Sequence, residues 1–518
     1  MKRSLQRVIQ VTFISFFSIV LLFAQGGLND NRVMLQGFYW ESYRNGHMQQ
    51  FPEITKGVAN QSKCWYEIVK DKSNEIRQGY FDLVWLPPPS AAGGAGYSPS
   101  ELFNLNNMYG DSVKHRAMLV ELWKNGEEPL ADIVINHRNG VGSWATFKNP
   151  NWSTTTICRY DEAFTNVSSE VYNLPLDQRG NEEEDVSAYD PSLGRAYAYP
   201  SFRDIDHTNT VVRKDIIRYL LLLKSYGYRG WRYDMVHGYH AKHIADYNNM
   251  THPTFSVGEY DWDNQPAWRG WIWNTSISKS GAGDEWIKTS SSVFDFTTHF
   301  LLEKYIGSGC NHTANYQMLY AYGNGLGLMG DNTDQITWKN KAVTFLENQD
   351  TGWRTNEDLT NEKDHDFDSF SDDWQIEQGY AYILTHPGVP CVFWKHYFDW
   401  GKDLQNKIKA LIVARKVAGV NSGSNIHTQD NAKQKGVYAA MIEGTNGQLY
   451  VRIGGDDTNW MPAMSGYKPT TEYAAGNGWK VWIKLKDPAK NTKKQTIPLN
   501  NPFINIPTII PVSQIQVP

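Results

Sequence analysis

"GWRYDMVHG", residues 230–238, places an arginine and an aspartate two positions apart in a short, largely apolar segment. Side chains alternate between the two faces of a β-strand, so Arg232 and Asp234 should share one face if the segment is extended. A neighbouring guanidinium favours the ionised form of a carboxyl group and orients it. The segment therefore predicts a strand that ends in an ionised, oriented carboxylate.

Seven further segments also contain short apolar runs, and amphipathic, helix-like segments lie between them. They are residues 33–40, 81–87, 130–137, 254–260, 293–296, 342–350 and 389–394. Apolar strands that alternate with helices are typical of parallel strands buried on both faces. The fold class predicted is therefore α/β, with a (β/α)8 TIM barrel.

Two stretches depart from this alternation. Residues 138–205 are polar, contain many Gly, Asn and Ser, and are too long for an ordinary loop, so they indicate a small domain inserted after the third strand. Short alternating strands after about residue 420 indicate a C-terminal antiparallel β-sandwich domain. The predicted parts are the barrel (28–137 and 206–415), the inserted domain (138–205), the C-terminal domain (420–485) and a Pro-rich tail or linker (486–518).

Residues 1–24 have the pattern of a secretory signal peptide. Lys2, Arg3 and Arg7 are followed by an apolar stretch to about Phe23, and cleavage is expected near Ala24. A membrane anchor is the alternative reading, but the apolar run is short for a spanning helix. We expect an exported protein, extracellular or periplasmic, with no membrane span in the mature chain.

Composition excludes other classes. The formal net charge of −5 gives no basic footprint for nucleic acid. The four cysteines, Cys64, Cys158, Cys310 and Cys391, are scattered without a Cys-x-x-Cys pattern, which disfavours a zinc site. Export permits disulfides without requiring them, and Cys391, in an apolar segment, is expected to be a buried thiol.

Barrel enzymes carry their active sites at the carboxyl ends of the strands. Asp234 ends the fourth predicted strand, Glu259 the fifth and Asp350 the seventh. Carboxylates that face one pocket are typical of glycoside hydrolysis, with one as nucleophile and another as proton donor. Arg232 would keep Asp234 ionised. Glu259 is expected to lack such a local cation and is flanked by Tyr260 and Trp262, so it is the expected proton donor.

Four segments at these strand ends resemble, in order and spacing, the signature regions of the alpha-amylase family, glycoside hydrolase family 13. They are "ADIVINH" (131–137), "GWRYDMVHG" (230–238), "VGEY" (257–260) and "FLENQD" (345–350). "FRDIDHTN" (202–209) looks like a fifth region. Other segments are similar to the plant- and archaeal-type members, and the resemblance covers roughly residues 30 to 485.

The resemblance implies a role for each site residue. Asp234 would be the nucleophile, Glu259 the acid/base, and Asp350 the stabiliser of an oxocarbenium-like transition state. The residues that would bind the sugar at the point of cleavage are Arg232, His137, Tyr97, Gln349 and His237.

The implied activity is that of a secreted, monomeric, endo-acting alpha-amylase. It would hydrolyse α-1,4-glucosidic bonds of starch or glycogen-type polysaccharides with retention, through a covalent glycosyl-enzyme. A maltooligosaccharide-forming amylase or an α-glucanotransferase of the same family is an alternative. A weakly active or non-catalytic glucan-binding protein is another, which the three intact carboxylates disfavour.

One position departs from the family pattern. The fourth region has Asn-His-Asp in the family, whereas this chain has Gln349 between Asn348 and Asp350. An imidazole can carry charge and an amide cannot, and charge-assisted hydrogen bonds are roughly twice as strong as neutral ones. We expect transition-state binding to be weaker by about 1–2 kcal/mol, on the order of tenfold in rate, and not an inert protein.

The resemblance also implies a bound Ca²⁺ that joins the barrel to the inserted domain. The implied ligands are Asn136, Asp204 and the backbone carbonyl of Gly238, with Asp190 as a further candidate whose local spacing differs from the family. Ca²⁺ prefers several oxygens from carboxylates, amides and carbonyls. The alternative for Asp204 is a turn or helix-capping aspartate, because a helix-like segment follows it.

Overall fold

The computed structural model describes most of the chain after residue 27. The residues described are 28–44, 63–142, 145–159, 161, 175–180, 189–190, 195–196, 202–260, 265–278, 285–307, 313–320, 325–333, 338–352, 354–355, 363–364, 370, 372–455, 460–465, 472–491, 495 and 497–517. The predicted signal peptide, Trp262 and Cys310 lie outside them.

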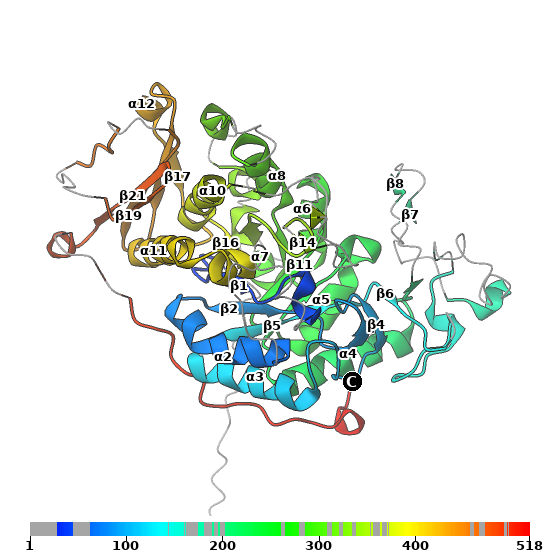
Figure 1. Ribbon diagram of the computed structural model, residues 1–518. Helices are drawn as coiled ribbons and strands as arrows, with labels where there is room; N and C mark the ends of the chain where they lie inside the picture. The colour runs from blue at the N-terminus through cyan, green and yellow to red at the C-terminus, as the bar shows by residue number, and fades with distance from the viewer. Residues whose placement is uncertain are drawn as a thin grey trace, which may run out of the picture.

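Eight parallel strands close into a barrel, in the order β1-β16-β13-β12-β11-β10-β5-β2 (Figure 1). Their bounds are β1 (Met34–Gln36), β2 (Leu83–Leu86), β5 (Glu128–Ile133), β10 (Gly230–Tyr233), β11 (Ser256–Gly258), β12 (Ser292–Phe294), β13 (Ala342–Phe345) and β16 (Val389–Phe393). Each lies within or overlaps one of the eight predicted segments, which confirms the (β/α)8 barrel. Asp234, Glu259 and Asp350 follow the ends of their strands and lie in the loops at the carboxyl ends, whereas Arg232 lies within β10.

Helices surround the barrel. Those described are α2 (Trp65–Gln78), α3 (Ser112–Asn125), α4 (Thr210–Tyr226), α5 (Ala241–Thr251), α6 (Gln265–Asn274), α7 (Glu285–Thr289), α8 (Phe296–Tyr305), α9 (Gly327–Gly330), α10 (Asp373–Thr385) and α11 (Lys402–Ala418). Side chains cap several of them: Asp111 accepts a hydrogen bond from the backbone of Lys114 at the start of α3, and Asn209 from that of Val211 at the start of α4. The main hydrophobic core includes residues of the strands and of the inner faces of these helices.

Short helical turns occupy several of the connections. They are η1 (Trp40–Arg44), η3 (Thr154–Thr156), η5 (Leu176–Gln178), η7 (Val236–Gly238), η9 (Tyr316–Tyr320), η11 (Trp338–Lys341), η13 (Pro488–Lys490), η14 (Val512–Gln514) and the π-helical turn η12 (Lys395–Asp399). Two small hairpins, β3 (Ala91–Gly93) with β4 (Ser98–Glu101) and β14 (Arg354–Thr355) with β15 (Lys363–Asp364), also lie in loops.

The segment after the third barrel strand contains little regular structure among its described residues. β6 (His137–Arg138) pairs antiparallel with β9 (Arg203–Asp204), so the segment leaves and re-enters the barrel at one place. β7 (Tyr189–Asp190) pairs with β8 (Arg195–Ala196) and lies to one side of the barrel in Figure 1. The boundaries of a separate inserted domain stay a prediction.

A five-stranded antiparallel sheet follows the barrel, which confirms the predicted C-terminal β-domain. Its order is β17 (Ile426–Thr428), β18 (Tyr438–Glu443), β19 (Gly447–Ile453), β21 (Trp479–Leu485) and β20 (Ala474–Gly476). A short helix, α12 (Asp430–Lys433), precedes β18. In the described part of this region there is one such sheet, and it packs on helices α10 and α11 of the barrel. At that contact, Glu377 accepts a hydrogen bond from Trp479 Nε1 at 3.1 Å and forms an ion pair with Lys407 at 2.7 Å.

The Pro-rich tail lies against the outside of the barrel. Figure 1 shows it running along α2 and α3 to the C-terminus. The backbone N–H of Phe503 donates to Trp123 O at 2.9 Å, and the two rings meet edge to face with centroids 5.2 Å apart. The guanidinium of Arg229 lies 4.4 Å from the centre of the Phe503 ring. These contacts bind the end of the chain to the barrel's helical surface.

Two other features bear on the sequence predictions. Cys391 is buried, as expected, and Cys64 and Cys391 are free thiols. Within the ranges described above, no helix combines the length and apolarity needed to cross a membrane.

Candidate active site

Arg232 joins three carboxylates at the carboxyl end of the barrel. Its Nη1 atom lies 2.6 Å from Asp132 Oδ1 and 2.6 Å from Asp234 Oδ1. Its Nη2 atom lies 2.7 Å from Glu259 Oε1. The arginine side chain is only 1% exposed, and that of Glu259 is the most exposed of the acids at 12%. We call these four residues the charged side of the site.

The strand register brings the charged side together. Arg232 on β10 is paired with Asp132 on β5 and with Val257 on β11. Beyond the strands, the backbone N–H of Glu259 donates to Tyr233 O at 2.9 Å. Met235, directly after Asp234, has a left-handed backbone with φ +43°, which is unusual for a residue with a side chain. Such turns are strained and gather at functional sites.

The expectation that Glu259 has no local cation is wrong. Arg232 contacts Glu259 as closely as it contacts Asp234. The prediction considered only neighbours along one strand, whereas parallel pairing places residues of β10 beside the end of β11. Both proposed catalytic acids therefore share one guanidinium.

Asp132 was missed in the sequence analysis, although it lies inside the signature segment "ADIVINH". It is fully buried on β5 and accepts hydrogen bonds from Tyr97 Oη at 2.9 Å and Trp85 Nε1 at 3.1 Å. Burial raises the pKa of Asp132 to about 7, and the negative charge of Asp234 acts in the same direction, while Arg232 opposes both. An aspartate within an otherwise apolar strand was the signal that could have identified it.

Tyr97 and His137 lie beside the charged side. His137 Nε2 is 2.8 Å from the backbone oxygen of Tyr97, which fixes the position of the imidazole. The rings of Tyr97 and Trp40 are parallel, with centroids 6.0 Å apart. Burial raises the pKa of Tyr97 well above its ordinary value, and Asp132, Asp350 and Asp234 add to the effect. The negative charges of Asp132, Asp234 and Asp350 therefore all act on the hydroxyl of Tyr97.

A second group of residues, at the ends of β1 and β13, carries Asp350 and is built from amides. Gln349 Nε2 donates to Asp350 Oδ2 at 2.7 Å, and Gln36 Nε2 donates to Gln349 Oε1 at 2.6 Å. Asn348 Oδ1 accepts hydrogen bonds from the backbone of Asp350 at 2.8 Å and Thr351 at 3.0 Å, which fixes the turn after β13. We call Gln36, Gln349 and Asp350 the amide side. Gln36, a polar residue at the end of the apolar strand β1, was also missed.

His237 lies further along the loop after β10. Its ring centre is 5.9 Å from that of Tyr260, the residue after Glu259. It is partly exposed, unlike Arg232. The structure thus places His237 next to the charged side, at its solvent edge.

Three of the four proposed calcium ligands meet where the inserted segment returns to the barrel. Asn136 Nδ2 is 3.3 Å from Asp204 Oδ1, and both residues are buried. Gly238 is packed so closely that a Cβ atom there would lie 1.8 Å from Asn136 Oδ1. An amide, a carboxylate and a backbone carbonyl form the kind of donor set that fits Ca²⁺. Asp190 is in β7, and its side chain is outside the described part of the structure.

Most of the proposed donors in this set are not acidic side chains. In the described part of the chain, no group of three or more His, Cys, Asp or Glu side chains could hold a metal ion. Asp204 is the single acidic side chain among the described candidates. An ion at this place would rely on Asp204, Asn136 and backbone carbonyls.

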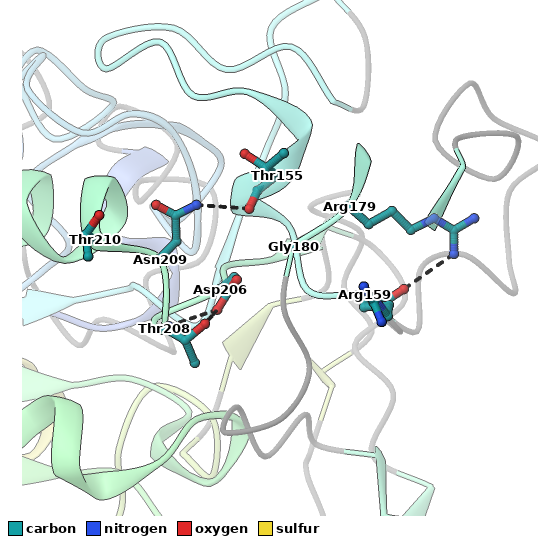
Figure 2. Close-up of a pocket in the computed structure, with 8 residues that line it drawn as sticks. All are labelled: Thr155, Arg159, Arg179, Gly180, Asp206, Thr208, Asn209 and Thr210. Atoms are coloured by element: carbon teal, nitrogen blue, oxygen red, sulfur yellow. Dashed lines mark hydrogen bonds between the residues drawn. The ribbon is translucent and has the colours of Figure 1, made fainter. Parts of the chain in front are cut away.

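A separate hollow of about 460 Å³ lies beside the start of α4 (Figure 2). It is lined by Thr155, Arg159, Arg179, Gly180, Asp206, Thr208, Asn209 and Thr210. Asp206 Oδ1 accepts hydrogen bonds from the backbone and hydroxyl of Thr208, and Asn209 Nδ2 donates to Thr155 O at 3.0 Å. The proposed catalytic carboxylates do not line it, so the hollow is distinct from the candidate active site.

Comparisons with known sequences agree with the signature segments. Residues 417–483 match a family model described as the alpha-amylase C-terminal beta-sheet domain. The chain is 29% identical over 469 residues to probable alpha-amylase 2 of Arabidopsis thaliana, covering 88% of this chain and 95% of that protein. It is 30% identical over 479 residues to chloroplastic alpha-amylase 3 of the same plant, covering 87% of this chain but 44% of that protein. It is also 26% identical over 477 residues to the glucan 1,4-alpha-maltotetraohydrolase of Stutzerimonas stutzeri, covering 87% and 73%.

Solved structures share the fold. The alpha-amylase of Geobacillus thermoleovorans, complexed with acarbose, aligns with a TM-score of 0.51 at 14% identity, covering 75% of this chain and 80% of that one. CldA, a cyclomaltodextrin glucanotransferase with a three-domain distribution, aligns with a TM-score of 0.59 at 15% identity, covering 88% and 100%. Identities this low show a common fold only.

Proposed function

The chain belongs to the alpha-amylase family of glycoside hydrolases, and from this premise we propose that it is an exported, endo-acting alpha-amylase. Its substrate would be an α-1,4-glucan of the starch or glycogen type, cleaved with retention of the anomeric configuration. The observation that carries the proposal is the contact of Arg232 with the carboxylates of two neighbouring strand ends, Asp234 and Glu259.

Each carboxylate has a chemical task in this proposal. Asp234, oriented by its contact with Arg232, attacks the anomeric carbon while Glu259 donates a proton to the departing glucosidic oxygen. This forms a covalent bond between the sugar and Asp234 and releases one end of the glucan. Glu259, now ionised, takes a proton from water, whose oxygen attacks the same carbon and frees Asp234. Asp350 stabilises the positive charge that develops on the sugar in both steps.

The shared guanidinium is compatible with a proton on Glu259. Arg232 supplies one positive charge to three acids, so the fully ionised cluster would hold two uncompensated negative charges in a buried site. Like charges at short range favour the neutral form of one of the acids that carry them. The raised pKa of Asp132, about 7, has this same cause in part.

Ca²⁺ is the cofactor we propose for the junction of the barrel and the inserted segment. Asn136, Asp204 and the carbonyl of Gly238 would hold it, and Asp190 is a further candidate. When bound, the ion would supply charge and rigidity rather than chemistry. His137 follows Asn136 directly, so an ion bound to Asn136 would help to keep His137 in its contact with Tyr97.

The direct test is the release of reducing sugars from soluble starch. The wild-type protein should release them, and Asp234→Asn should lose roughly 10³-fold or more of this activity because the nucleophile is gone. Asp246→Asn is the matched control, since Asp246 is exposed on α5; it should behave as wild type. A wild-type protein that binds starch without releasing sugars would instead favour the glucan-binding alternative.

The second candidate is a maltooligosaccharide-forming amylase. The similarity to a maltotetraohydrolase over 87% of this chain favours it. Both activities use the same carboxylates, so the products distinguish them. A chromatogram of products from amylose over time should show a broad mixture early in an endo-acting reaction and one dominant short product in the alternative.

A further inference from the structure

Asp350 is held by a chain of two neutral amides in place of a charged group. Gln36, at the end of β1, is fully buried, and Gln349 is 2% exposed. The hydrogen bonds run in one direction, from Gln36 Nε2 to Gln349 Oε1 and from Gln349 Nε2 to Asp350 Oδ2. The strands involved, β1 and β13, are both neighbours of β16 in the barrel.

The direction of this chain matters because the two ends of an amide differ. An ionised carboxylate only accepts hydrogen bonds, so Gln349 must turn its NH₂ group toward Asp350. If Gln349 turned over, its oxygen would face the carboxylate and its NH₂ group would face the NH₂ group of Gln36. Gln36 therefore makes the productive orientation of Gln349 the favoured one.

We infer that Gln36 is a positioning residue that orients Gln349, so that the amide of Gln349 holds Asp350 ready for the transition state. The inference rests on the proposed function, in which Asp350 stabilises charge on the sugar, and extends it to a residue of another strand. Gln36 also has a buried Oε1 atom with no hydrogen-bond partner among the described residues. Among the described residues, the side-chain amide of Gln36 therefore makes its hydrogen bond to Gln349.

A histidine at position 349 would not need this help. Either ring nitrogen of an imidazole can carry the proton, so a histidine can donate to Asp350 whichever way its neighbour points. The contribution of Gln36 should therefore depend on which residue occupies position 349. Such dependence is what a double-mutant cycle measures.

The experiment compares kcat and KM on soluble starch for wild type, Gln36→Met, Gln349→His and the double variant. Methionine keeps the length of the side chain and removes its hydrogen bonds. Gln36→Met should lower kcat about tenfold in the wild-type background, with little change in KM. In the Gln349→His background the same change should cost less than about twofold.

Gln378→Met is the matched control. Gln378 is a buried glutamine on α10 whose Nε2 donates to Asn477 O at 3.3 Å, at the contact with the C-terminal sheet. Its replacement should have the same effect in both backgrounds. Gln36→Asn, which keeps an amide but shortens its reach, provides a second variant if Gln36→Met does not fold.

The outcomes separate this inference from the proposed function. Equal losses from Gln36→Met in both backgrounds would mean a general packing role and overturn the inference, as would no loss in either. A wild-type protein that releases no sugar would defeat the proposed function itself, and the inference with it.

Discussion

The two sides of the site hold their carboxylates by different means. On the charged side, one buried arginine contacts Asp132, Asp234 and Glu259. On the amide side, the neutral amide of Gln349 donates to Asp350, and Gln36 donates in turn to Gln349. A contact between two charged groups is stronger than one between a charged group and an amide, and the amide donor itself does not titrate. We expect the first to set the chemistry of the site and the second to set its geometry.

Replacing the guanidinium of Arg232 should have the largest effect on activity. In Arg232→Lys a single ammonium cannot contact three carboxylates as the guanidinium does. Both proposed catalytic acids would then be misplaced, so kcat/KM on soluble starch should fall about 10²- to 10³-fold. Steady-state kinetics would measure it.

The control is Arg229→Lys, the same change just before the other end of β10. Arg229 forms an ion pair with Glu128 at 3.4 Å and stacks on Phe503, away from the site. It should keep nearly full activity. A full rate in Arg232→Lys would mean that the charged side does not set the chemistry.

Chelation tests whether the charged side needs support from the inserted segment. Because Asn136 directly precedes His137, loss of a structural Ca²⁺ should loosen this edge of the barrel. An excess of chelator should lower the melting temperature by about 4 °C or more, since a ligand that binds the folded state stabilises it. Differential scanning calorimetry would measure the shift.

Asp204→Asn provides the control for chelation. This variant should begin with a lower melting temperature and respond little to chelator, because a main ligand is already absent. If chelator leaves the wild-type melting temperature unchanged, the proposed calcium site is wrong.

Gln349→His would convert the amide side into a partly charged one. An imidazolium beside Asp350 can form a charge-assisted hydrogen bond, so kcat/KM on soluble starch should rise on the order of tenfold. The gain should be greatest below the pKa of the new histidine. A decrease at every pH would show that the amide suits this site better than an imidazole does.

Asp132→Asn should have the smallest effect, and its signature is pH dependence. The pKa of Asp132 is about 7 in the folded protein against an ordinary value of 3.8. As pH rises, the unfolded chain loses this proton first, so the wild type loses stability between about pH 4 and about pH 7. The melting temperature of the variant minus that of wild type should rise by about 2 °C or more across that range. If this difference in melting temperature does not change with pH, Asp132 does not titrate in this range.

The strands and the charged residues at their ends could be predicted from the sequence for a physical reason. Apolar runs report burial in a parallel barrel, and parallel strands bring their carboxyl ends to one rim, so Asp234 and Glu259 had to be neighbours. Contacts across strands were less predictable. The register that places Arg232 between Asp132 and Glu259, and β1 near the loop after β13, is fixed only when the barrel closes.

The tail illustrates the same limit. Its Pro-rich sequence indicated a tail or linker, because proline-rich segments lack the periodicity of helices and strands. It nevertheless packs on α3 through Phe503 and Trp123. The hydrogen bond there comes from the backbone of the tail, which side-chain patterns do not report.

The most direct test of the central claim is to trap the covalent intermediate. A slow fluorinated maltosyl fluoride should attach its sugar to the wild-type protein, and mass spectrometry of the peptides should find the added mass on Asp234. Attachment to another residue, or none while starch is still cleaved, would contradict the claim that the acid beside Arg232 is the nucleophile.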